Sequence, residues 1–147
     1  MSEYRIEPIG REHLSDVAEL EKLCFAQPWS ESALGLLLTD AATGFVCLLD
    51  GRAVAYGGML LAPDEGQITN IAVHPDHRRL GLGARLMERL EGAARSRGFL
   101  QIALEVRASN EAAIALYEGT GYAVAGRRPN FYTSPREDAL VMIRALG

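Results

Sequence analysis

A basic turn with two glycines, over residues 74–84, holds the residue types best suited to binding a ligand. An apolar run over residues 68–73 precedes the turn, and a helical pattern follows it. Gly81 and Gly83 allow the backbone to approach an anion without Cβ clashes. Free N–H groups at a helix start point toward such an anion, and the helix dipole favours negative charge there. Because Arg78 adds positive charge, the segment predicts a cradle for a pyrophosphate group.

The spacing of this turn separates it from two other phosphate-binding motifs. The dinucleotide fingerprint needs a third glycine and an acidic residue about 20 positions later, and the phosphate loop ends in Lys-Ser/Thr. Taken alone, a glycine pair before a helix is common, and Arg78 and Arg79 have an ordinary explanation as solvated charge. The order Arg78, Gly81, Gly83 nevertheless resembles the Arg/Gln-x-x-Gly-x-Gly/Ala coenzyme A signature of the GNAT acetyltransferases. That resemblance implies acetyl-CoA as the co-substrate.

A second block, Leu104–Glu118, joins a strand-like run to a helix-like run. Strand alternation places Glu105 and Arg107 on one face, where neighbouring charges are usually only solvated. Asn110 suits a helix cap, and Tyr117 lies at helical spacing from an apolar residue, as core residues often do. Considered one at a time, these residues have ordinary structural explanations.

Together, the turn and this block resemble the RimI-type N-terminal acetyltransferases, which modify the alanine of a ribosomal protein. The family string Leu-Glu-Val-Arg-Ala-Ser-Asn stands unbroken from Leu104 to Asn110, and Pro28-Trp29-Ser30 and Arg136–Ala139 extend the resemblance toward both ends. The resemblance implies that Glu105 is the proton acceptor and Tyr117 the proton donor. It implies contacts with acetyl-CoA from Ile71, Ala72, Val73, Arg78, Arg79, Leu80, Gly81, Leu82, Gly83, Ala84, Asn110 and Tyr117.

The segment before the last strand departs from the family pattern. Where the family commonly has Arg-Asn-Tyr-Tyr, this chain has Arg128-Pro129-Asn130-Phe131-Tyr132. Pro129 fixes its own φ and removes a backbone donor, and Phe131 lacks a hydroxyl group. We expect Trp29, Phe131 and Tyr132 to form a wall of the substrate site. The departure therefore bears on the choice of acceptor more than on catalysis.

The expected reaction is direct attack of a neutral amine on the acetyl thioester, without a covalent enzyme intermediate. A peptide α-amine has a reference pKa near 8 and a lysine amine near 10.4, so deprotonating the lysine costs roughly 3 kcal/mol more at neutral pH. A protein N-terminus is therefore the easier acceptor, and the resemblance implies the N-terminal alanine of a small-subunit ribosomal protein. Glu105 would take the proton through a water, and Glu65 is the alternative base. Two other functions stay open: acetylation of a small amine or lysine side chain, and acyl-CoA binding without turnover.

The bulk composition fits one globular domain over residues 1–147, since 48% of the residues are hydrophobic and 23% are charged. A formal net charge of −4 argues against direct nucleic-acid binding. No run reaches the roughly 18 apolar residues of a membrane span, and the first residues lack a signal-peptide pattern. We therefore expect a cytoplasmic protein with no membrane contact, and a monomer.

Neither the cysteines nor the histidines predict a metal site. Cys24 and Cys47 lack metal-ligand spacing and have the surroundings of small buried hydrophobic residues. His74 and His77 are three positions apart, but no further ligand set completes a zinc site. We expect these two histidines to shape the turn before the cofactor loop.

Hydrophobic periodicity predicts a mixed α/β fold. Strands are expected at residues 4–9, 45–49, 52–61, 67–73 and 102–106, with two more between 122 and 146, and helices at 11–25, 30–38, 83–97 and 110–118. Asp50-Gly51 marks a tight hairpin turn. A strand, a helix and a strand over residues 67–106 imply a right-handed parallel crossover, with the ligand at the carboxyl ends of its strands. The resemblance implies the GNAT fold, a mostly antiparallel twisted sheet flanked by helices with this crossover at the acetyl-CoA site.

Overall fold

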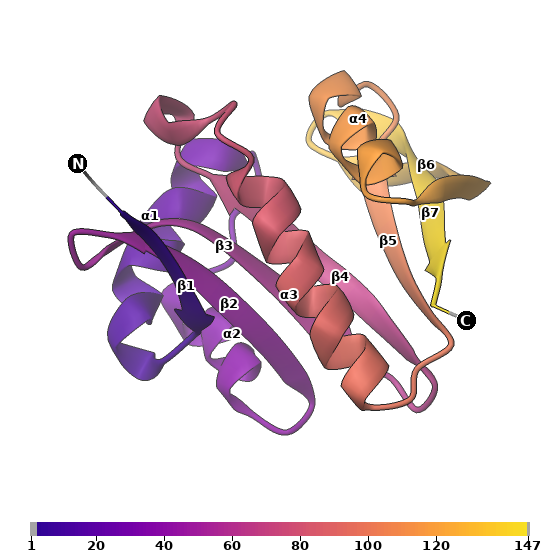
Figure 1. Ribbon diagram of the computed structural model, residues 1–147. Helices are drawn as coiled ribbons and strands as arrows, with labels where there is room; N and C mark the ends of the chain where they lie inside the picture. The colour runs from indigo at the N-terminus through magenta and orange to yellow at the C-terminus, as the bar shows by residue number, and fades with distance from the viewer. Residues whose placement is uncertain (1–2, 147) are drawn as a thin grey trace.

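A seven-stranded mixed sheet organises the computed structural model, which describes residues 3–146 (Figure 1). The strand order is β1-β2-β3-β4-β5-β7-β6. Every neighbouring pair is antiparallel except β4 and β5, which are parallel, so the expected sheet type is confirmed. The strands are β1 (Tyr4–Pro8), β2 (Ala42–Leu49), β3 (Arg52–Leu61), β4 (Glu65–Val73), β5 (Gln101–Arg107), β6 (Ala123–Thr133) and β7 (Arg136–Ala145).

Helices cover both faces of this sheet (Figure 1). The α-helices are α1 (Leu14–Cys24), α2 (Glu31–Leu34), α3 (Leu82–Ser96) and α4 (Glu111–Gly119), and three 3-10 turns are η1 (Arg11–His13), η2 (Gly35–Leu38) and η3 (Pro75–His77). One hydrophobic cluster joins α3 and α4 to one face of the sheet, and a second joins α1 and α2 to the other face. The crossover β4-α3-β5 is the predicted one.

Both helices predicted within the first 40 residues occur at the expected positions, but each is divided into an α-helix and a 3-10 turn. The helix expected over residues 11–25 begins as the separate 3-10 turn η1. The helix expected over residues 30–38 divides at Gly35 into α2 and η2, since glycine weakens a continuous helix. Its cap is confirmed, because Ser30 Oγ accepts a hydrogen bond from the backbone N–H of Ala33 at 3.0 Å.

The first hairpin has the turn that its sequence predicts. Asp50 and Gly51 have φ values of 51° and 80°, the left-handed pair required by a two-residue turn. Strand β2 starts at Ala42, earlier than expected, because Ala42 pairs with Leu60 and lengthens the ladder. The two cysteines differ in setting: Cys47 is fully buried as predicted, whereas Cys24 is only half-buried.

Strands β4 and β5 separate soon after they begin to pair. Their parallel ladder contains only Glu65 with Gln101, Gly66 with Ile102 and Gln67 with Ala103. Beyond it β4 runs to Val73 and β5 to Arg107, and the two strands diverge (Figure 1). Beyond the ladder, backbone groups on the facing edges have no partner in the other strand and can bind a ligand, except that the Val73 carbonyl accepts from Arg78 Nε. A bulge in the β3–β4 ladder, between Gly57 and Met59, lies beside this opening.

Two glycine substitutions test the hairpin and α3 separately. Gly51→Ala should lower the free energy of unfolding by about 1 kcal/mol, because alanine disfavours the positive φ of this turn. Gly92→Ala, at an exposed site on α3 with open space around it, should raise it by up to about 1 kcal/mol. Urea denaturation measures both changes, and a stabilising Gly51→Ala would contradict the turn.

Candidate active site

A cavity of about 360 Å³ lies on the α1 side of the sheet, where β4 and β5 have separated. It brings together Glu105 from β5, Trp29 from the α1–α2 connection, and Phe131 and Tyr132 from β6. The remaining lining residues are Phe25, Ala26, Gln27, Leu60, Gln67, Ile68, Thr69, Asn70 and Arg107. The three aromatic residues expected at the substrate site thus line one cavity with the expected base.

The carboxylate of Glu105 lies on the open side of this cavity. Its Oε2 pairs with Arg128 Nε at 2.9 Å, while the side chains of Glu105 and Arg128 are 36% and 60% exposed. Exposed ion pairs contribute little, typically below about 1 kcal/mol, so an incoming cationic amine can replace Arg128 at modest cost. Glu105 is therefore accessible to an acceptor.

The alternative base, Glu65, lies at the closed end of the split. Its two carboxylate oxygens accept hydrogen bonds from Gln101 Nε2 at 2.8 Å and Gln67 Nε2 at 3.0 Å. Glu65 does not line the cavity. Between the two carboxylates that the sequence offers, the geometry favours Glu105.

Arg107 holds the β6–β7 turn that closes one side of the cavity. Its Nη1 donates to the carbonyl of Pro135 at 2.9 Å, and its guanidinium lies 4.3 Å from the ring centroid of Tyr132. It also pairs with Glu137 at 3.3 Å. Hydrogen bonds from Ser109, followed by Arg107, hold the pKa of Glu137 below its ordinary value. Sequence reasoning gave Arg107 no role, since only the folded turn places these partners around it.

Tyr117 and Glu105 lie on opposite sides of the sheet. It is buried in the cluster that contains Leu104 and Val106, whose side chains occupy the face of β5 opposite Glu105. Burial, with a smaller contribution from Tyr132, raises the pKa of Tyr117 to about 12. Its hydroxyl is therefore protonated at neutral pH and able to donate.

The glycine-spaced turn has the backbone expected of an anion cradle. Gly81 has φ 78° and caps α3 without a side-chain hydrogen bond, and Arg79 is also left-handed at φ 65°. The first-turn N–H groups of α3 have no partner within the helix. Gly83 also allows close packing of two helices. A Cβ at this position would lie 3.0 Å from Leu116 Cδ2, so glycine lets α3 approach α4. Leu82 and Gly83 are buried, so they can offer only backbone to a ligand.

Arg78 anchors this turn to the end of β4. Its Nε donates to the carbonyl of Val73 at 3.1 Å, and its Nη2 lies 3.6 Å from Cys24 Sγ. Cys24 is thus a half-buried neighbour of the glycine-spaced turn rather than a fully buried core residue, which corrects the prediction for it. The expected role of the histidines is confirmed: His74 Nδ1 accepts from the Asp76 amide at 3.1 Å, and His77 Nδ1 lies 2.9 Å from Tyr4 Oη.

Asn110 is the N-cap of α4. Its Oδ1 accepts a hydrogen bond from the amide of Ala113 at 3.1 Å, which is the capping role that its residue type suggests. A contact between Asn110 and acetyl-CoA stays a prediction. Across residues 3–146, no cluster of three or more His, Cys, Asp or Glu side chains has metal-binding geometry. Nor does any helix in that part of the chain have the length and hydropathy to cross a membrane.

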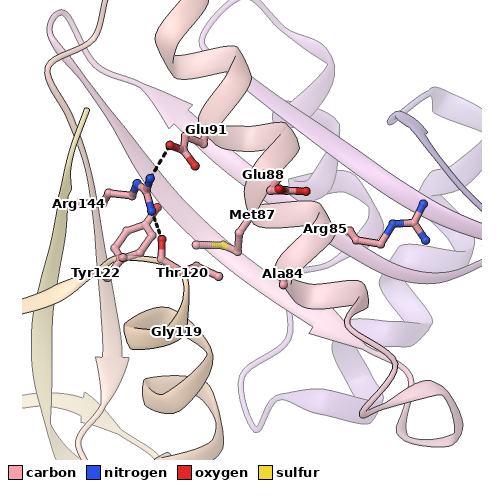
Figure 2. Close-up of a pocket in the computed structure, with 10 residues that line it drawn as sticks. Ala84, Arg85, Met87, Glu88, Glu91, Gly119, Thr120, Tyr122 and Arg144 are labelled. Carbon is pink, nitrogen blue, oxygen red and sulfur yellow. Dashed lines mark hydrogen bonds and ion pairs between the residues drawn. The ribbon is translucent and has the colours of Figure 1, made fainter. Parts of the chain in front are cut away.

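A second cavity, of about 530 Å³, lies between α3 and the α4–β6 connection (Figure 2). Arg144 on β7 forms its wall, with Nη2 2.8 Å from Glu91 Oε1 and a hydrogen bond to the carbonyl of Thr120. Among the predicted site residues, only Ala84 lines it. The sequence carried no sign of this cavity, because its lining residues occupy ordinary helix, loop and strand positions.

Comparison with known proteins identifies the family. A model of the acetyltransferase (GNAT) family matches residues 14–122, and the chain belongs to that family of acetyl-CoA-dependent acetyltransferases. The chain is 41% identical to the ribosomal protein bS18-alanine N-acetyltransferase of Escherichia coli K12 over 125 residues, which cover 84% of each chain. A putative enzyme of the same name from Bacillus subtilis is 35% identical over 133 residues, covering 89% of this chain and 88% of the relative.

The solved structures agree with this assignment. The crystal structure of the ribosomal-protein-S18-alanine N-acetyltransferase from Escherichia coli matches with a TM-score of 0.90 at 36% identity, over 99% of this chain and 95% of that one. Ard1 from Thermoplasma volcanium has the same fold, with a TM-score of 0.87 at 23% identity over 97% of each chain. The resemblance to the RimI-type enzymes and the expected GNAT fold are both confirmed.

Tyr117→Phe tests the proposed proton donor. We expect kcat to fall by about 10- to 100-fold, because the variant keeps the ring but loses the hydroxyl that would stabilise the departing thiolate. The KM for acetyl-CoA should change by less than about twofold. Tyr122→Phe is the matched control, since its buried ring lies 6.0 Å from that of Tyr117. An unchanged kcat with a raised KM in Tyr117→Phe would remove Tyr117 from the donor role.

Proposed function

We propose that this enzyme transfers the acetyl group of acetyl-CoA to a protein N-terminal amine, with the N-terminal alanine of ribosomal protein bS18 as its principal substrate. The observation that carries the proposal is the position of Glu105 at the open side of an aromatic-lined cavity. Relatives that are 41% identical in sequence, or that match with a TM-score of 0.90, are named for that alanine. A cavity open to solvent also suits a substrate whose chain continues outward from the reacting end.

The residues present fit acetyl-CoA. The first-turn amides of α3, with Arg79 beside them, suit the pyrophosphate, and the free edge of β4 over Ile71–Val73 suits the extended amide-bearing arm. Acetyl-CoA supplies the thioester that the amine attacks. Backbone N–H groups at Ile71 and Val73 can polarise the thioester carbonyl, an effect worth a few kcal/mol when the donors are preorganised.

The two faces of the sheet divide the acid–base work. Glu105 takes a proton from the ammonium group on the α1 side, directly or through a water, which leaves a neutral amine to attack. Tyr117 acts from the α3 side toward the sulfur. With a pKa of about 12 against about 8.5 for an ordinary thiol, full proton transfer from Tyr117 is uphill by about 5 kcal/mol. Hydrogen bonding to the thiolate is therefore the main contribution of Tyr117.

Product mapping tests the acceptor class. The enzyme is given acetyl-CoA with either a peptide that has a free N-terminal alanine or an Nα-blocked peptide that carries one lysine, and thiol release and acetylated masses are measured. We expect modification of the first peptide only. Modification of only the second would replace the α-amine with a lysine amine as the substrate. Release from neither peptide would favour a small amine or acyl-CoA binding without turnover.

Glu105→Gln tests the base. We expect kcat to fall by about 100-fold, because glutamine fills the same space but cannot accept the proton. Glu65→Gln is the matched control at the closed end of the split, and it should leave kcat near the wild-type value. The opposite ranking of the two variants would assign the base to Glu65.

A further inference from the structure

A buried carboxylate lies beneath the acceptor cavity. Glu21 on α1 is 0% exposed, although the surrounding helix face is apolar. Its Oε1 accepts from the backbone N–H of Trp29 at 2.8 Å, and its Oε2 accepts from Tyr56 Oη at 2.5 Å. Asn70 Nδ2 donates to Oε2 at 3.0 Å and approaches Oε1 at 3.3 Å. Glu21 thus joins α1, the α1–α2 connection, β3 and β4.

The donors around Glu21 match an ionised carboxylate, which accepts hydrogen bonds and donates none. All three partners are donors, and no ion pair among residues 3–146 includes Glu21. Burying a carboxylate costs less free energy when fixed donors satisfy its oxygen atoms than when those atoms have no partner. Burial, reinforced by the charge of Glu21, raises the pKa of Tyr56 and keeps its hydroxyl a donor.

This carboxylate fixes which way the Asn70 amide faces. Only the Nδ2 group of Asn70 can pair with an acceptor, so Nδ2 must turn toward Glu21 and Oδ1 away from it. Asn70 is half-buried and lines the cavity that holds Glu105. Among the hydrogen bonds of residues 3–146, Asn70 Oδ1 has no donor. A directed acceptor oxygen is therefore left beside the cavity.

The β3–β4 bulge explains why Asn70 reaches this position. Ile68 and Ile71 both pack against the cluster on the α3 side, although a regular strand would turn residues three apart to opposite faces. Ala72 and Asn70 face α1 instead, where Ala72 joins the second cluster and Asn70 meets Glu21. The bulge therefore brings Asn70 to Glu21 at the mouth of the split.

We propose that Asn70 Oδ1 binds an N–H group of the acceptor amine or its first peptide unit, and that Glu21 is the positioning residue that turns Asn70 to do so. The proposal rests on the amine-acetylating function proposed above. The same carboxylate holds the backbone at Trp29, so it fixes an aromatic wall and a polar contact of one cavity together. Glu21 contributes to acceptor binding without touching the acceptor.

Two variants test the proposal. Glu21→Gln introduces an NH₂ donor that can pair with Asn70 Oδ1 and so turn it away from the cavity. Asn70→Ala removes Oδ1 and leaves Glu21 with its other donors. Each should raise the KM for the acceptor roughly tenfold while the KM for acetyl-CoA changes by less than about twofold. The double variant should be no worse than about the larger single effect, because both changes remove one contact.

Tyr56→Phe is the matched control. It removes another donor to the same buried carboxylate, but Tyr56 does not line the cavity. We expect a lower melting temperature and an unchanged acceptor KM. A tenfold rise in acceptor KM for Tyr56→Phe as well would show that Glu21 acts only through general stability, which contradicts the proposal.

The comparison uses whichever amine the wild-type enzyme acetylates, so it separates this proposal from the proposed function. Acceptor KM values within about twofold of wild type for both Glu21→Gln and Asn70→Ala would overturn the role of Asn70 and leave the proposed function standing. Transfer by the wild-type enzyme to no amine at all would overturn the proposed function and this inference with it.

Discussion

The early separation of β4 from β5 is the constraint on which the site depends. Three parallel pairs hold the strands together, and beyond Gln67 and Ala103 each strand presents a free edge. Unpaired backbone groups at the centre of a sheet are costly unless a ligand or water satisfies them. The split therefore costs stability in the fold and creates a binding edge at the same place. It also makes both faces of the sheet accessible from one point, which an unbroken sheet would prevent.

In the proposed mechanism, the chemistry is divided between the two faces of the sheet because strand residues alternate. Glu105 points to the α1 side, while its neighbours Leu104 and Val106 point to the cluster that holds Tyr117. A polar, open environment on one side keeps a carboxylate accessible, and burial on the other side keeps a tyrosine protonated. One strand thus separates two groups with opposite protonation requirements. The Arg107 and Glu21 networks then fix the two walls of the acceptor side.

Local patterns predicted the parts of the fold that local forces determine. Asp50-Gly51 predicted the turn between β2 and β3, Ser30 predicted the cap of α2, and the glycine-spaced turn predicted the start of α3. Each of these features depends on backbone preferences over a few residues. The family string around Glu105 predicted a base at the acceptor site. The fold places Glu105 at the cavity, and its role as the base stays a prediction. These predictions needed no knowledge of distant contacts.

Contacts between distant segments account for what the sequence did not reveal. Glu21 follows the apolar spacing of α1, and only the arrival of Tyr56 and Asn70 from two strands shows that it is a buried charge. The sequence predicted a buried core position for Cys24, because the local pattern does not show that Arg78, 54 positions later, lies beside it. The cavity beside Arg144 likewise depends on α3, the α4–β6 connection and β7 meeting.

The most direct test of the central claim is a crystal structure of the enzyme with a bisubstrate conjugate, in which coenzyme A is linked through an acetyl bridge to the α-amine of an alanine-initiated peptide. The account predicts that the linker lies between the free edge of β4 and Glu105. The peptide should then lie among Trp29, Phe131 and Tyr132. A peptide bound instead in the cavity between α3 and Arg144, or a linker remote from Glu105, would contradict the account.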